Sequence, residues 1–229
     1  MSNGQVGAIF RTCASSRQTL PLVLIRALEN IRSAKHAGLS PILFVIPRDH
    51  DCGETADCLR RAASRDDSII VMQTSGELES VLLLKRAFTQ LQFYGIEYAA
   101  VVSHQGARYL NRTMVQKAQK AFERGRKVVG VMLPGRNNAL PISNECAFWH
   151  IDTLFNVGAF KNVCGLFELV TLLRIEFNYE SCTSVIAVSQ KKATSTEERI
   201  DASRMQHEYA HVARISTTLR MIVNDIEFL

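Results

Sequence analysis

The stretch Asn144-Glu-Cys-Ala-Phe-Trp-His-Ile-Asp-Thr-Leu-Phe-Asn-Val-Gly-Ala-Phe160 places the only tryptophan of the chain inside a long apolar run. Polar side chains interrupt this run, among them Asn144, Glu145, His150 and Asp152. Polar groups that become buried need hydrogen-bond partners, so their positions within an apolar run carry information. The stretch therefore predicts one wall of a pocket, built around Trp149.

The chain has 229 residues, and 47% of them are hydrophobic, which suffices for one domain with a sizeable core. No apolar run approaches the roughly 20 residues that cross a bilayer. The first residues lack the basic and apolar segments of a secretory signal. None of the six cysteines forms a Cys-x-x-Cys pair, which disfavours a zinc knuckle and a thioredoxin-type site. These features predict a cytoplasmic protein with reduced thiols.

The net charge of +5 suits a phosphorylated small molecule, a polyanion or an anionic membrane surface. Basic residues are dispersed along the sequence and form no basic run. A nucleic-acid partner is therefore not favoured by the charge pattern.

Apolar runs alternate with helical periodicity over the first 133 residues. Five runs predict strands: Val6–Phe10, Pro41–Ile46, Ser68–Met72, Tyr98–Val102 and Lys127–Leu133. Four segments predict the intervening helices: Leu20–Ala37, Thr55–Ser64, Glu77–Phe93 and Asn111–Arg124. Continuously apolar strands separated by helices predict an α/β domain with a mostly parallel sheet covered on both faces. The stretch 144–160 then supplies a strand or short helix, and Gly165–Phe177 a further helix.

Polar residues follow the first four predicted strands, at Arg11–Arg17, Pro47–Glu54, Gln73–Gly76 and Ser103–Arg108. Ligands of open parallel sheets bind outside these carboxyl ends. Guanidinium groups match phosphate oxygens, and four arginines are candidates to neutralise a diphosphate: Arg11, Arg17, Arg48 and Arg108. No Gly-x-Gly-x-x-Gly and no phosphate-loop motif follows the first strand, which disfavours a dinucleotide fold and a phosphate-loop NTPase.

This succession of strand ends, followed by the Trp149, Leu154 and Gly158-Ala-Phe160 positions, resembles a GT-A glycosyltransferase, in particular the inverting family 2 type. The resemblance covers roughly residues 6 to 180. It implies a nucleotide-diphosphate sugar lying across the strand ends, and transfer of the sugar to an acceptor hydroxyl. The implied contacts around the nucleotide are Arg11, Thr12, Asp49 or Asp51, and Lys85 or Arg86.

Family members hold a divalent metal, Mg²⁺ or Mn²⁺, on an Asp-x-Asp motif at the end of the fourth strand. This chain has Ser103-His104-Gln105 there, so the metal carboxylates are missing and His104 is the remaining candidate ligand. The three residues are also candidates for direct contact with the substrate. The metal requirement is thus left open.

The resemblance also implies a carboxylate general base on the helix after the Gly-Ala-Phe turn, where Glu168 lies. Arg174 takes the place of a helix arginine that faces the diphosphate, and Trp149 would form an apolar face for a sugar ring. Ordinary core packing is the alternative role for Trp149, because aromatic side chains bury a large area whatever their function.

We expect a GT-A-like domain over residues 1–188, followed over 189–229 by a polar loop and an amphipathic helix near 197–222. This helix packs on the domain, lies on a membrane surface or forms a dimer contact. Two other functions remain open beside glycosyl transfer. One is a catalytically inactive binding or scaffolding module of the same fold, and the other is a basic α/β protein that interacts with nucleotides or RNA.

Overall fold

The computed structural model describes residues 4–12, 17–48, 53–74, 81–132, 146–152 and 183–187. The strands of these regions are β1 Val6–Arg11, β2 Ile42–Pro47, β3 Ile69–Thr74, β4 Tyr98–Val102, β5 Val128–Met132, β6 Cys146–His150 and β7 Thr183–Ala187. The helices are α1 Leu20–Ala37, α2 Gly53–Ala63, α3 Val81–Phe93, α4 His104–Ala107 and α5 Arg112–Glu123.

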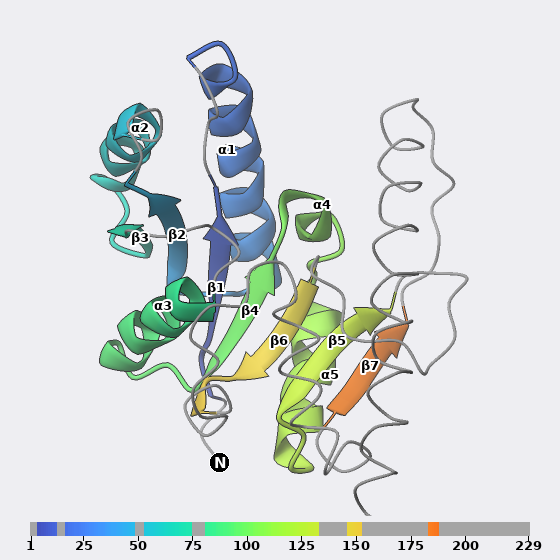
Figure 1. The fold of residues 1–229 in the computed structure, drawn as a ribbon. Coiled ribbons are helices and arrows are strands. Elements are labelled where there is room, and N and C mark those ends of the chain that lie inside the picture. The colour runs from blue at the N-terminus through green and yellow to red at the C-terminus, as the bar shows by residue number, and fades with distance from the viewer. Residues whose placement is uncertain are drawn as a thin grey trace, which may run out of the picture.

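The strands form one seven-stranded sheet in the order β3-β2-β1-β4-β6-β5-β7, which Figure 1 shows from left to right. β1 pairs in parallel with both β2 and β4, and β2 pairs in parallel with β3. β6 is antiparallel to its neighbours β4 and β5, whereas β5 and β7 are parallel. The predicted α/β class and mostly parallel sheet are therefore confirmed.

The helix ends follow from local sequence. α1 has Pro21 in its first turn, where a missing N–H costs nothing, and it ends at Gly38, whose φ of 82° lies in the left-handed region. Asn111 caps α5 by accepting a hydrogen bond from Met114 N at 2.9 Å. Because these start and stop residues are recognisable in the sequence, both helices were predicted with bounds close to the observed ones.

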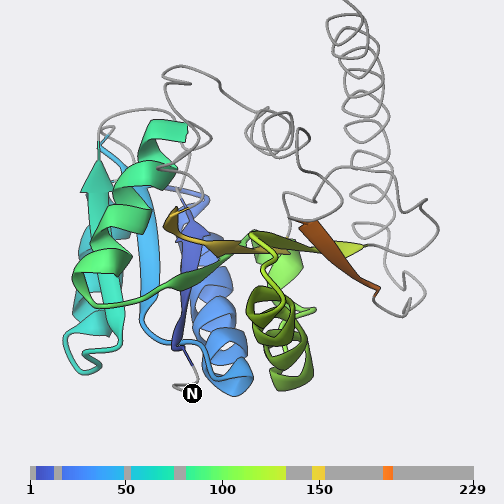
Figure 2. The same ribbon diagram turned by 90° about the horizontal axis from the view of Figure 1, so that it is seen from below.

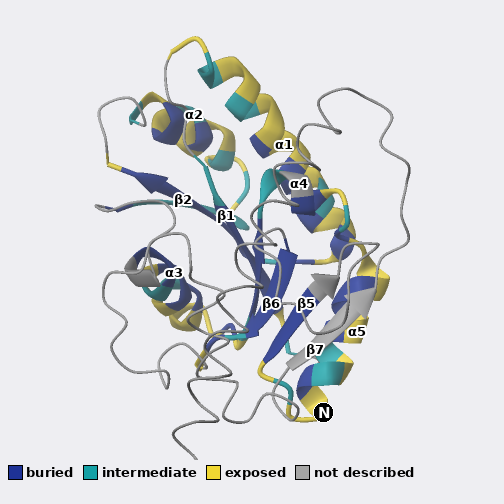
Figure 3. Cartoon of the chain, turned by 45° about the vertical axis from the view of Figure 1, so that its right-hand side comes forward, coloured by how far each residue is buried: buried dark blue, intermediate teal, exposed yellow. Residues whose placement is uncertain are grey.

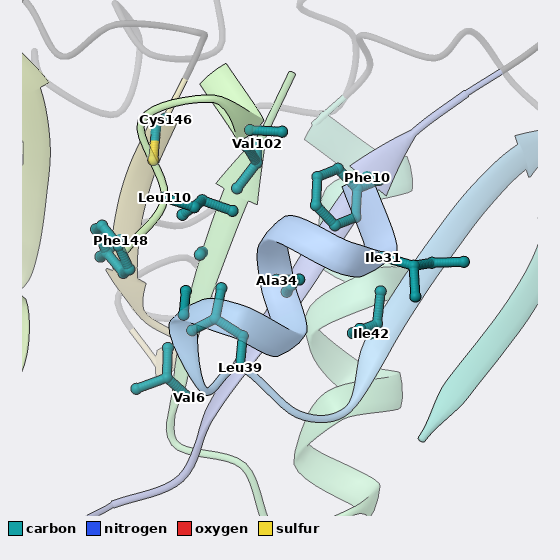
Figure 4. Packing of buried hydrophobic residues seen from close by; sticks show 14 of the residues in the cluster. Val6, Phe10, Ile31, Ala34, Leu39, Ile42, Val102, Leu110, Cys146 and Phe148 are labelled. Carbon is teal, nitrogen blue, oxygen red and sulfur yellow. The ribbon is translucent and has the colours of Figure 1, made fainter. Parts of the chain in front are cut away.

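The face of the sheet that carries α1, α2, α4 and α5 holds the larger of two hydrophobic clusters. Phe10 and Phe44 stack there with ring centroids 5.5 Å apart, and Ala34 of α1 lets the helix approach the strands closely (Figure 4). Tyr98 stacks on Phe122 at 4.5 Å and so joins β4 to α5. Aromatic pairs of this kind anchor helices to the sheet.

The opposite face is covered by α3. Figure 2 shows this helix on one side of the sheet with α1 and α5 on the other. Leu84, Phe88 and Leu91 of α3 pack against Ile9 and Val101 of the central strands. Neighbouring residues of each strand thus enter opposite clusters, as the pleat requires, and both faces of the central strands are buried (Figure 3).

Two described elements were not predicted, the short helix α4 and the strand β7. The stretch 144–160 forms a strand over Cys146–His150, one of its two predicted alternatives. The predicted helices Gly165–Phe177 and 197–222, together with the loop and helix assigned to 189–229, lie outside the described residues.

Candidate functional site

The chain changes direction across the sheet between β1 and β4. The strand order runs outward from β1 to β2 and β3, and then returns to the other side of β1 with β4. In open α/β sheets, loops diverge at such a switch point and leave a crevice outside the carboxyl ends of the strands. Phe10 of β1 pairs with Val102 of β4. The next residues, Arg11 and Ser103, therefore lie beside one another at the carboxyl ends of these two strands.

Two further contacts fix the backbone where β1 and β2 end. Thr12 N donates to Val45 O at 3.1 Å, and Arg48 N donates to Thr74 O at 3.0 Å. Both bonds extend the ladder one residue past the strands, which holds the start of each loop. Arg11 is partly buried on the α3 face, next in alternation after Ile9, whereas Arg48 is exposed.

A second cationic position lies where α3 begins. Arg86 Nη1 donates to Oγ1 of Thr74, the last residue of β3, and Thr74 is only 4% exposed. Lys85 is partly buried beside it. The predicted pair Lys85 and Arg86 therefore lies at the carboxyl edge of the sheet, on the same face as Arg11.

Arg17 lies in the loop that leads into α1. Its Nη2 forms an ion pair with Glu54 Oε1 at 2.7 Å, and 87% of the arginine side chain is exposed. A pair so exposed contributes little stability. The guanidinium can therefore exchange this carboxylate for another anion at low cost.

Ser103 and His104 are held in place by α4 and α1. Ser103 caps α4 by accepting from Gly106 N at 3.0 Å. His104 Nδ1 lies 3.2 Å from Oδ1 of Asn30, a side chain of α1 that is 5% exposed. Because a carbonyl oxygen only accepts, Nδ1 carries the proton and Nε2 has the lone pair of the neutral ring.

Nε2 of His104 lies 4.0 Å from Glu29 Oε2, so a histidine and a carboxylate are close together at the end of β4. No group of three His, Cys, Asp or Glu that could hold a metal ion exists among the residues that the structure describes. Asp49, Asp51 and Glu168, the carboxylates that sequence placed nearest to this point, lie outside those residues. The metal assignment of His104 stays a prediction.

Asn30 and Glu29 are the site residues that sequence reasoning missed. The available signal was Asn30 itself, because asparagine is a poor residue for the interior of a helix and it falls here on the apolar face of α1. A buried amide on such a face needs a polar partner from another element.

Trp149 lies away from the carboxyl ends of the strands. It pairs with Ala99 of β4, toward the amino end of that strand, and only 1% of it is exposed. Its ring belongs to the cluster beneath α3. The structure therefore gives Trp149 a packing position, and a contact with a sugar stays a prediction that would require the indole to become exposed.

His150 and Asp152 of the same segment contact residues of neighbouring elements, although Nδ1 of His150 is buried without a hydrogen-bond partner in the described structure. His150 meets the Tyr98 ring edge-on at 5.3 Å between centroids, and Asp152 Oδ1 accepts from Gln92 Nε2 at 2.7 Å. Glu145 and Arg174 lie outside the described residues, as does the side chain of Gln105.

No family model matches the sequence, and no curated protein matches it. Solved structures do match the fold. A cytidylyltransferase from Leptospira borgpetersenii serovar Hardjo-bovis is 10% identical, with a TM-score of 0.55, over 83% of this chain and 79% of that one. A putative glucose-1-phosphate thymidylyltransferase from Bacillus anthracis, in complex with sucrose, is 10% identical, with a TM-score of 0.55, over 91% and 95%.

A third structure is CMP:2-keto-3-deoxy-manno-octonic acid synthetase complexed with CTP. It is 12% identical, with a TM-score of 0.52, over 89% of this chain and 99% of that one. The chain has a nucleotide-diphospho-sugar transferase-like fold. The sequence resemblance is thereby confirmed at the level of the fold, and membership of glycosyltransferase family 2 is not shown by these similarities.

None of the helices in the described part of the chain has the length and apolar character needed to span a bilayer.

Proposed function

We propose that this protein is a nucleotide-dependent transferase that binds the phosphate groups of its substrate at the carboxyl edge of the sheet. The observation that carries the proposal is the set of cations gathered there from separate parts of the sequence: Arg11, Arg17, Arg48, Lys85 and Arg86. Arg17 of this set forms an exposed ion pair with Glu54. The excess of positive charge favours a polyanionic ligand.

The orientation of the helices adds to this charge. α1, α2 and α3 each follow a strand of the parallel set and so begin at its carboxyl edge (Figure 1). The N-terminal end of a helix carries a partial positive charge and free backbone N–H groups. A phosphate at this edge would therefore meet both arginine side chains and helix ends.

Nucleotidyl transfer is the reaction that we favour. The three similar structures named above are a cytidylyltransferase, a putative thymidylyltransferase and a CMP-sugar synthetase, and one of them holds CTP. In such a reaction an oxygen of the acceptor attacks the α-phosphorus of a nucleoside triphosphate, and the bond to pyrophosphate breaks. Arginine and lysine at the carboxyl edge would neutralise the departing pyrophosphate.

Glycosyl transfer is the second candidate, supported by the sequence resemblance. An acceptor hydroxyl would then attack the anomeric carbon of a nucleotide-diphosphate sugar, with Glu168 taking the proton and a nucleoside diphosphate leaving. Asp49, Asp51 and Arg174 would contact the nucleotide in this reaction, and Trp149 the sugar. The two reactions differ in the leaving group, which gives a direct assay.

The first experiment measures binding of CTP, UTP, TTP, ATP and GTP, and of UDP- and GDP-sugars, by calorimetry with and without Mg²⁺ or Mn²⁺. We expect at least one nucleotide to bind, and Arg11→Gln to weaken that binding about tenfold or more, because a hydrogen bond to a charged group contributes about 1.5 to 3 kcal/mol. Arg32→Gln is the matched control, since Arg32 is exposed on α1. Absence of any nucleotide binding would overturn the proposal.

The second experiment follows the leaving group while the bound nucleotide is incubated with a panel of sugar phosphates and sugar acids. Pyrophosphate release supports nucleotidyl transfer, and nucleoside diphosphate release from a sugar nucleotide supports glycosyl transfer. If Glu168→Gln left glycosyl transfer unchanged, the base assignment would be wrong. Binding without either product would support the inactive binding module.

A further inference from the structure

Exposed basic side chains gather on two parts of the described structure. One group lies at the carboxyl edge of the sheet, and a second group lies on α5.

The α5 cationic face consists of Lys117, Lys120, Arg124 and, after the turn that follows the helix, Lys127. All four side chains are exposed. Lys117, Lys120 and Arg124 are three and four residues apart, so they share one side of the helix. The buried residues of α5 occupy its other side: Met114, Val115, Ala118 and Phe122.

This face lies apart from the proposed phosphate site. α5 packs on the sheet beside α1, as Figure 2 shows, and leads into β5. Val128, the first residue of β5, pairs with Trp149, which in turn pairs with Ala99 near the amino end of β4. Arg124 and Lys127 therefore lie at the amino edge of the sheet, opposite the carboxyl edge.

Some cations on α1 and α2 pair with nearby carboxylates. Lys35 pairs with Asp66, and Arg60 pairs with Asp57 at 3.0 Å. Within the described part of the chain, no carboxylate lies within 4.0 Å of the α5 cationic face. A row of like charges costs self-repulsion, which a polyanion would relieve.

The surroundings of the face distinguish between polyanionic partners. The exposed large hydrophobic residues of the described chain are Leu22, Ile25, Leu28, Phe93 and Tyr94, and none of them is on α5. A membrane-bound helix buries an apolar face in the lipid, and a protein interface has an apolar centre depleted of lysine. Nucleic-acid interfaces are polar and strongly positive, as this face is.

The same absence favours a duplex over a single strand. Proteins that hold single strands stack the bases on aromatic side chains, and the α5 cationic face offers none. Lys117 and Arg124 lie about 10 Å apart along the axis at 1.5 Å per residue. This span equals about three base-pair steps of a duplex, so the row can lie along a phosphate backbone.

We propose that the α5 cationic face binds the phosphate backbone of a nucleic-acid duplex, independently of base sequence. The test measures binding of fluorescently labelled 20-base-pair RNA and DNA duplexes over a series of salt concentrations. Both duplexes bind at low salt, and the affinity falls as salt rises because phosphate contacts release counter-ions. The combined variant Lys117→Gln, Lys120→Gln and Arg124→Gln weakens binding about tenfold or more and lowers the slope of log K against log salt by about 2 to 3.

The matched control is Arg60→Gln, Arg61→Gln and Arg65→Gln, which removes the same charge from exposed positions on and just after α2. The control retains duplex binding, and CTP at saturating concentration does not displace the duplex. Equal weakening by both triple variants, displacement by CTP, or no binding by the wild-type protein at low salt each overturns the proposal. So does stronger binding to phosphatidylserine vesicles than to either duplex, with the same loss in the α5 variant.

Discussion

At the scale of single residues, the pairing of Asn30 with His104 joins the end of β4 to α1. The amide of Asn30 is buried, and its oxygen accepts from the ring that directly follows the N-cap of α4. The pair fixes the ring orientation of His104 and the position of the β4 end at once. Its value for stability lies mainly in avoiding an unpaired buried group.

Asn30→Ala should therefore destabilise the protein by about 1 to 3 kcal/mol, because it removes the acceptor of a partly buried N–H and leaves a small cavity. Urea unfolding measures the change. Arg32→Ala, on the exposed side of the same helix, should stay within about 0.5 kcal/mol of the wild type. Equal losses of stability from the two substitutions would show that the hydrogen bond between Asn30 and His104 makes no particular contribution to stability.

His150 makes stability depend on pH. Burial, and secondarily the charge of Lys127, lower the pKa of His150 below its ordinary value of 6.5. As pH falls, His150 is therefore protonated at a higher pH in the unfolded chain than in the folded protein. Stability should fall as pH drops from above 6.5 toward the lowered pKa, and should be fully present above 6.5.

His150→Phe keeps an aromatic edge against Tyr98 and removes the titrating group. Its urea midpoint should change less between neutral and mildly acidic pH than that of the wild type. An unchanged pH dependence would assign the effect to other groups.

Only the part of the candidate site that lies at strand ends could be predicted, because apolar runs in the sequence show where the strands end. Arg11, Arg48 and Ser103 follow strands that the sequence predicts directly, so their common edge could be foreseen. Asn30 could not be paired with His104, because 74 residues separate them and only the packing of α4 on α1 brings them together. Trp149 was interpreted from residue type alone, which does not reveal its burial.

At the scale of elements, the contact of β1 with α3 depends on Gly7. A Cβ at this position would lie 3.1 Å and 3.2 Å from the two δ-carbons of Leu91 and 3.4 Å from Cγ2 of Ile96. The helix approaches the central strand so closely that an added Cβ would require the Leu91 side chain to move by a few tenths of an ångström.

Gly7→Ala should destabilise the protein by about 1 to 3 kcal/mol through overpacking. Adding Leu91→Val should recover part of this loss, since the two positions share the same space. Gly53→Ala is the control, because a Cβ there meets nothing within 4 Å. Calorimetric unfolding of the wild type, Gly7→Ala, Leu91→Val and the double variant measures the coupling, and additive losses would contradict the steric account.

Apart from α4, the elements up to residue 132 were predicted closely, because residues that start or end helices and strands mark their bounds. α1 is bounded by Pro21 and Gly38, and β4 by Gly95 and Ser103. β7 was missed because Thr183–Ala187 is short and mixes polar with apolar residues, so no period identifies it. The antiparallel direction of β6 depends on tertiary pairing that no local pattern records.

At the scale of the whole molecule, the single tryptophan reports on the integrity of the core beneath α3. Trp149 is 1% exposed in the wild-type fold, so its fluorescence should be blue-shifted and poorly quenched by acrylamide. Global unfolding should shift the emission to the red. Nucleotide binding at the carboxyl edge should leave the emission unchanged, because Trp149 lies toward the amino end of β4.

A sugar that stacked on the indole would instead alter the emission. Quenching by a bound sugar nucleotide, but not by the nucleotide alone, would support the role that sequence resemblance gave to Trp149. The same titration therefore distinguishes a Trp149 that stays buried in the core from a Trp149 that contacts the sugar.

The place of β6 in the sheet has a consequence for the growing chain. β4 and β5 emerge from the ribosome before β6, yet β6 lies between them and pairs with both. Until residue 150 has been made, the edges of β4 and β5 that face β6 lack their partner, and unpaired edges readily join other chains. A nascent or truncated chain that stops before Cys146 should therefore aggregate, and completion of this one strand joins β4 and β5 into one sheet.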